Sequence, residues 1–81
     1  MLTRVAVISM IVEDRESVEQ LNTLLHEYGE YIIGRMGLPY KEKSMNIISV
    51  AIDAPLDVIN ALTGALGRLP GVTAKAAYAK E

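Results

Sequence analysis

Cysteine is absent from this 81-residue sequence, and histidine occurs only once. Without cysteine the chain can form no disulfide, no thiolate metal site and no cysteine nucleophile, and a single histidine excludes a histidine cluster. A chain of this length buries only about 60–65% of its unfolded surface, so a small domain usually gains stability from disulfides, a metal or association. We therefore expect no metal site, and we expect self-association.

Long apolar runs are also absent, although 51% of the residues are hydrophobic. No run reaches the ~18–20 residues that a membrane-spanning helix needs. The first residues lack a small-residue cleavage site and lead directly to Glu13 and Asp14, so they predict a strand and not a signal peptide. Together with the lack of cysteine, this favours a cytoplasmic protein that contacts no membrane.

Tryptophan and phenylalanine are missing, and the eight Lys and Arg residues are outnumbered by ten Asp and Glu residues. The net charge of −2 leaves no dense basic surface for phosphates, and few aromatic rings are present to stack on bases. We therefore expect no direct nucleic-acid binding.

Four apolar runs rich in β-branched residues predict four β-strands. We place these strands at residues 4–12, 30–36, 45–53 and 72–78. The first and third runs are apolar on both faces, as is typical of central strands. The Gly-Leu-Pro segment at 37–39 is expected to end the second strand, and a polar return follows it.

Two amphipathic stretches predict helices, because their apolar residues recur at helical spacing. The first is expected at residues 15–28, with Asp14 as its N-cap. The second is expected to begin at Asp53 as N-cap and to stop at Pro70.

The resulting order β-α-β-β-α-β predicts an α+β, ferredoxin-like (ACT-like) two-layer sandwich. Right-handed crossovers place both helices on one face of an antiparallel four-stranded sheet, with the first and third strands in its centre. We expect one such domain over residues 1–81.

The sheet face without helices is expected to be apolar. Alternation along the two central strands assigns seven residues to it: Val5, Val7, Ser9, Ile11, Ile47, Ser49 and Ala51. Because an exposed apolar patch usually marks an interface, we expect a dimer or tetramer that forms through this face. The alternative is that central strands are apolar in any case and that long side chains cover them.

The most individual segment of the sequence runs from Gly34 to Lys41. Arg35, Tyr40 and Lys41 are candidates for binding an anion or another small ligand. The alternative is a hairpin rim, or an oligomer contact through Arg35.

Catalytic machinery is not recognisable. The sequence contains no nucleophile–base pair, no metal-ligand spacing and no nucleotide fingerprint, so we predict no catalytic residues and no cofactor. His26 is expected on the surface beside the apolar stripe of the first helix. The carboxylates of Glu13, Asp14 and Glu16 suit either acid–base chemistry or helix capping, and capping is favoured.

Four segments resemble the iron-only hydrogenase system regulator family. They are IVEDR at 11–15, HEYGEYIIGRMGLPY at 26–40, DAP at 53–55 and LTG at 62–64. The resemblance extends over nearly the whole chain. It implies an ACT-like fold and a regulatory role in the maturation or expression of iron-only hydrogenase, without catalytic residues.

The predicted fold also resembles the C-terminal domain of nickel-responsive repressors, which bind metal through a His-x-His pair and a cysteine. This chain offers Leu38, Pro39, Tyr40 and Asn46 in that region, so the resemblance implies an oligomerisation scaffold without nickel sensing. ACT domains often bind amino acids near the turn after the first strand. Here this turn lacks glycine and carries three acids, which weakens the case for an amino-acid effector and above all for binding its carboxylate.

Taken together, these features predict a non-enzymatic, homo-oligomeric regulator that affects transcription indirectly, through a small-molecule effector or a partner protein. The alternative is a small-molecule-sensing ACT-like module that binds its ligand at a subunit interface.

Overall fold

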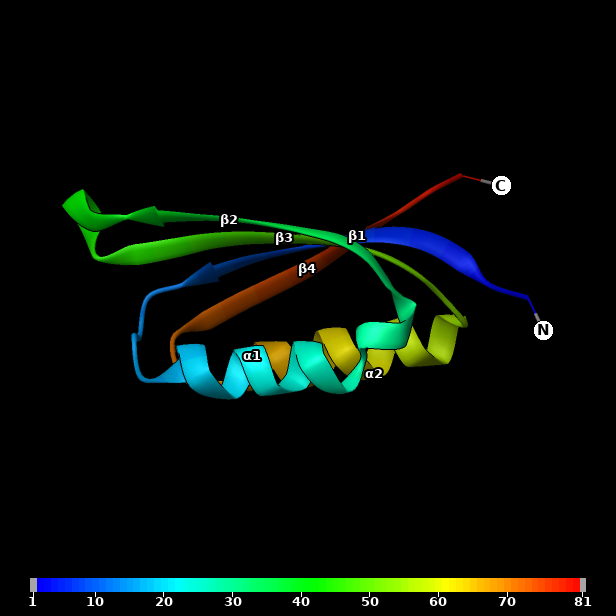
Figure 1. Cartoon of the computed structure of the whole chain (residues 1–81), viewed down its shortest axis with the longest axis horizontal. Helices are drawn as coiled ribbons and strands as arrows, with labels where there is room; N and C mark the ends of the chain where they lie inside the picture. Colours follow the sequence, from blue (N-terminus) through cyan, green and yellow to red (C-terminus); the bar gives the residue numbers. More distant parts are fainter. Residues whose placement is uncertain (1, 81) are drawn as a thin grey trace.

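The computed structural model describes residues 2–80 and consists of one sheet with two helices on one of its faces (Figure 1). The elements are β1 (Arg4–Val12), α1 (Ser17–Glu27), β2 (Ile32–Tyr40), β3 (Met45–Ala54), α2 (Leu56–Gly67) and β4 (Val72–Tyr78). Two short 3-10 turns flank β2, namely η1 (Gly29–Tyr31) and η2 (Lys41–Lys43). The predicted α+β ferredoxin-like fold is confirmed.

The sheet is antiparallel throughout, with the strand order β2-β3-β1-β4. The two strands rich in β-branched residues, β1 and β3, therefore pair in the centre as predicted. Ser9 marks the middle of this sheet, because it lies opposite Ser49 on one side and Lys75 on the other.

The core lies between the sheet and the helices. Its largest fully buried side chains are Ile8, Met10, Val12, Val50, Ile52, Leu21, Ile59, Leu62 and Leu66. The strand residues in this set alternate along β1 and β3, and the helix residues recur every three to four positions. The hydrophobic pattern thus selects which face of each element is buried.

Two hydrogen bonds join the loop after β1 to the turn before β4. The buried Ser17 hydroxyl donates to the Pro70 carbonyl at 2.6 Å, and the Glu13 amide donates to the Gly71 carbonyl at 2.7 Å. Gly71 has a φ of +69°, in the left-handed region that glycine adopts without steric cost. These contacts fix the point at which the chain enters α1.

The second strand differs from its predicted position. Residues 29–31 form the 3-10 turn η1, and β2 continues through Gly37 and Pro39 to Tyr40. The Gly-Leu-Pro segment does not end the strand, because β2 is an edge strand and pairs only with β3. An edge strand tolerates proline where the missing N–H would face solvent.

The predicted helix caps are also corrected. Asp53 remains in β3 opposite Val5, and α2 begins after Pro55 without a side-chain cap, because pairing with β1 extends to Ala54. The Asp14 carboxylate accepts a hydrogen bond from the Glu16 amide at 2.9 Å. It therefore holds the turn that precedes α1, which starts at Ser17.

No helix within residues 2–80 is both long enough and apolar enough to cross a membrane.

Candidate functional site

The face of the sheet opposite the helices is uncovered (Figure 1). In β1 and β3 the buried residues alternate with residues on this face, so the strand phase predicted from the sequence is confirmed. Val5, Val7 and Ile11 of β1 are 44%, 39% and 43% exposed, and Ile47 of β3 is 41% exposed. Ser9, Ser49 and Ala51 lie between them in the register.

Strand β2 extends this apolar surface, a contribution that was not predicted from the sequence. Met36 lies opposite Ser49, Leu38 opposite Ile47 and Tyr40 opposite Met45, so all three side chains share the uncovered face. Met36 is 70% exposed and Leu38 is 57% exposed.

We call this surface the open sheet face. Its large hydrophobic residues are Val5, Val7, Ile11, Met36, Leu38, Tyr40 and Ile47. Among the paired strand positions on this face, only Asp53 and Lys75 are charged. Asp53 lies near the end of β3, and Lys75 lies on the edge strand β4, opposite Ser9. The arrangement is an apolar platform with small residues, Ser9, Ser49 and Ala51, near its centre.

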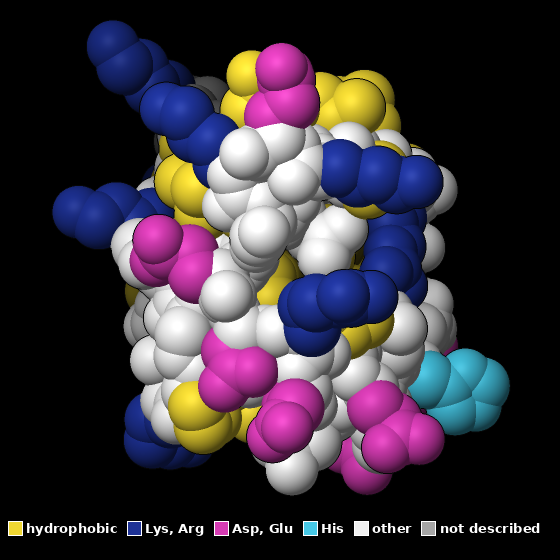
Figure 2. All heavy atoms as spheres, turned by 90° about the vertical axis from the view of Figure 1, so that its left-hand side faces the viewer, with side chains coloured by type: hydrophobic (Ala, Val, Ile, Leu, Met, Phe, Trp, Pro, Cys, Tyr) yellow, Lys and Arg dark blue, Asp and Glu magenta, His cyan; other side chains and the backbone are white. Residues whose placement is uncertain are grey.

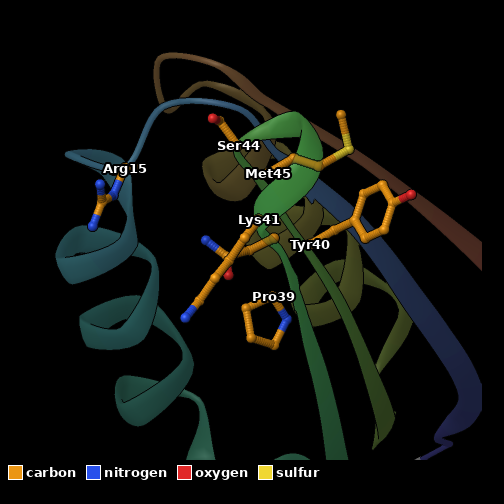
Figure 3. Close-up of a pocket in the computed structure, with 7 residues that line it drawn as sticks. Arg15, Pro39, Tyr40, Lys41, Ser44 and Met45 are labelled. Carbon is orange, nitrogen blue, oxygen red and sulfur yellow. The ribbon is translucent and has the colours of Figure 1, made fainter.

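A pocket of about 440 Å³ lies at the end of the β2–β3 hairpin, and we call it the hairpin pocket. Its lining residues are Arg15, Pro39, Tyr40, Lys41, Ser44, Met45 and Asn46. Arg15 comes from the loop before α1, and the other six come from the hairpin. Figure 3 shows the Tyr40 ring and the Met45 side chain on one side of the hairpin, whereas the Lys41 side chain extends on the other side.

Arg35 lies apart from the other two predicted ligand residues. It faces the helices opposite Val50, and its guanidinium donates to the Asn22 side-chain oxygen of α1 at 2.7 Å. Together with the exposed His26 it lines a separate pocket of about 360 Å³. Tyr40 and Lys41 thus line one pocket together with Arg15, whereas Arg35 lines another.

Metal ligands do not gather in the described part of the chain. Within residues 2–80 no three His, Cys, Asp or Glu side chains could hold a metal ion together. Of the three carboxylates near the start of α1, Asp14 has the turn-stabilising role described above.

Comparison with known proteins gives one family and a close structural relative. The chain matches, over residues 4–76, the TM1266-like family, described as "Iron-only hydrogenase system regulator, putative". It is similar to a solved structure, the uncharacterized protein TM1266 from Thermotoga maritima. The two are 39% identical with a TM-score of 0.93, over 96% of this chain and 99% of that one. No curated protein matches the chain. The resemblance seen in the sequence is confirmed: this chain belongs to the TM1266-like family of iron-only hydrogenase system regulators.

Proposed function

We propose that this protein is a non-enzymatic, cytoplasmic regulator of the iron-only hydrogenase system that works as a homo-oligomer. Copies of the chain associate through the open sheet face, and the effect on transcription is indirect. Family membership supports the regulatory role. The single observation that supports the oligomer is the set of seven exposed large hydrophobic side chains on one uncovered face.

The size of the open sheet face fits a stable interface. The four strands lie about 4.8 Å apart, and their lengths run from about 24 Å for β4 to about 34 Å for β3. They cover roughly 550 Å² in projection, and side-chain relief makes the accessible area larger. A standard interface buries about 800 Å² on each partner. Covering each half-exposed hydrophobic side chain contributes roughly 1 kcal/mol, so the face stabilises an oligomer by several kcal/mol per subunit.

Charge supports the indirect route to transcription. The chain carries a net charge of −2, which does not favour binding to the DNA backbone. A regulator with this surface reaches the transcription machinery through a partner protein or responds to an effector molecule.

Light scattering on matched variants tests the association. We expect the wild-type protein to have the mass of a dimer or larger at micromolar concentration. Ile11→Lys places a charge in the open sheet face and should give a monomer. Leu56→Lys changes a side chain with the same 43% exposure on α2, away from this face, and should keep the wild-type mass. A monomeric wild type would refute the proposed oligomer.

Gel-shift assays test the indirect route. The isolated chain should not retard DNA from hydrogenase promoters at physiological salt. Tight, sequence-specific retardation would show direct binding and would overturn this part of the proposal.

A second candidate function is small-molecule sensing, and the position of the hairpin pocket favours it. Tyr40 lines this pocket and also belongs to the open sheet face. A ligand in the pocket would therefore contact a residue that the neighbouring subunit covers. A thermal-shift screen tests this function, because a ligand at 100 times its Kd adds about 2.7 kcal/mol of stability. Unchanged melting with every metabolite would count against it.

A further inference from the structure

We propose that the hairpin pocket binds a small organic anion through Arg15 and Lys41. This inference rests on the second candidate function and names its ligand class: a molecule with a carboxylate or phosphate group and a short apolar body.

The charge of the lining residues carries the proposal. Two of the seven, Arg15 and Lys41, are cations, and none is acidic. Within residues 2–80, no ion pair or side-chain hydrogen bond engages the Arg15 guanidinium or the Lys41 ammonium group. Glu42 separates Lys41 from Lys43 in η2 but does not line the pocket. The lining therefore attracts negative charge, because Asp14 and Glu16, the acidic neighbours of Arg15 in the chain, do not line the pocket.

The neutral polar residues of the pocket add hydrogen-bond donors. The half-buried Asn46 amide and the Ser44 hydroxyl have no side-chain hydrogen bond to any described residue. An amide and a hydroxyl can each donate to an anionic oxygen. Figure 3 shows Lys41 extending into the space between the hairpin and the loop that carries Arg15.

The remaining lining residues and the pocket volume limit the ligand's size. Pro39 and Met45 supply apolar surface. About 440 Å³ lies within the usual 300–1,000 Å³ of small-molecule sites, toward the smaller end.

Figure 2 views the molecule from the hairpin end, where basic side chains gather mainly in the upper part and acidic ones mainly in the lower part, over the helices.

The N-terminus of α1 is not the anion-binding element. The Glu16 amide donates to the Asp14 carboxylate, the Ser17 amide to the Asp14 carbonyl, and the Val18 amide to the Arg15 carbonyl. These first amides are satisfied within the chain, so we assign the ligand to the lining side chains, with Arg15 and Lys41 supplying the positive charge.

NMR titration of the full chain with two probes tests the proposal. Inorganic phosphate and succinate are added separately at constant ionic strength, with sodium chloride as the reference salt, and the arms distinguish phosphate from carboxylate ligands. We expect at least one probe to shift the amide signals of Arg15 and of residues 41–46 in a saturable manner. Arg15→Gln combined with Lys41→Gln should weaken that binding by about tenfold or more.

A charge-matched control excludes a general effect of net charge. Arg68→Gln with Lys80→Gln removes two positive charges outside the pocket and should leave binding unchanged. The proposal fails if neither probe shifts these signals, or if the control pair weakens binding as much as the pocket pair. It also fails if a DNA duplex binds this pocket more tightly than phosphate or succinate and displaces the bound probe. Light scattering on the same samples reports association separately, so loss of anion binding with an intact oligomer leaves the oligomer proposal standing.

Discussion

At the scale of single residues, Gly71 and Ser17 determine how the loop before α1 is held. A Cβ on Gly71 would lie 2.7 Å from the Asp14 Cβ and 2.9 Å from the Asp14 amide nitrogen, which is closer than real contacts allow. The Gly71 carbonyl also accepts the hydrogen bond from the Glu13 amide. Only glycine provides both the positive φ and the space at this position.

Gly71→Ala should therefore destabilise the protein. The expected loss is about 1–3 kcal/mol, because the new methyl group meets backbone atoms and alanine is strained at this φ. Urea denaturation measures it at a fixed protein concentration. Gly37→Ala is the matched control, because its Cβ meets no atom within 4 Å and its φ is not positive. An equal effect at both glycines would contradict the steric explanation.

Ser17→Ala should cost about 1–2 kcal/mol, because it leaves the Pro70 carbonyl without its donor in a partly buried position. Thr23→Ala removes a hydroxyl that donates to the Glu19 carbonyl on the exposed face of α1, and it should change stability by less than about 0.5 kcal/mol. Thermal melts of the two variants give the comparison. If the two variants have the same melting temperature, the hydrogen bond from Ser17 to Pro70 does not stabilise the loop.

At the scale of elements, the sequence allowed correct prediction of those strands and helices that are buried by a regular pattern. β1 and β3 alternate strictly between core and open face, so their phase and their exposed residues could be predicted. β4 also has its predicted bounds, Val72–Tyr78. A buried face imposes this regularity, because a shift of one residue would expose the core.

Strand β2 could not be predicted in the same way. Eight of its nine residues are exposed, so no hydrophobic pattern marks its faces or its end. Its register shifts between Ile32 and Gly34, which reverses the side of the sheet that later residues occupy. From Gly34 to Tyr40 the pairing with β3 is regular, so Arg35 and Tyr40, five positions apart, point to opposite faces. The site expected around both residues is therefore divided. That Arg15 lines the same pocket as Lys41 depends on the fold and has no signal in their sequence spacing.

Truncation of a core residue tests how α1 is held on the sheet. Leu21 is fully buried, so Leu21→Ala should lower the unfolding free energy by about 2–5 kcal/mol. Leu56→Ala on α2 removes the same atoms from a side chain that is 43% exposed, and it should cost clearly less. Chemical denaturation of both variants is compared at one protein concentration, because association contributes to the measured stability. Similar losses would show that α1 is not anchored through Leu21.

At the scale of the whole molecule, a sheet with helices on one face leaves its other face to be covered by something else. The open sheet face joins β1, β2 and β3 into one apolar surface, and only Asp53 and Lys75 bring charge to its paired strand positions. A monomer would keep this surface in water. In the proposed oligomer, association of two or more chains would remove this surface from water and would place Tyr40, at the rim of the hairpin pocket, beside the neighbouring subunit.

The absence of cysteine from the chain allows one direct measurement of this coverage. Ser9→Cys introduces a unique thiol at the centre of the open sheet face, and Gln20→Cys introduces one on the exposed surface of α1. At micromolar concentration the thiol at position 9 should react with a maleimide about tenfold more slowly than the thiol at position 20. Its rate should rise on dilution or when Ile11→Lys is added. Equal rates at the two positions, unchanged by dilution, would show that water reaches the open sheet face and would contradict the oligomer.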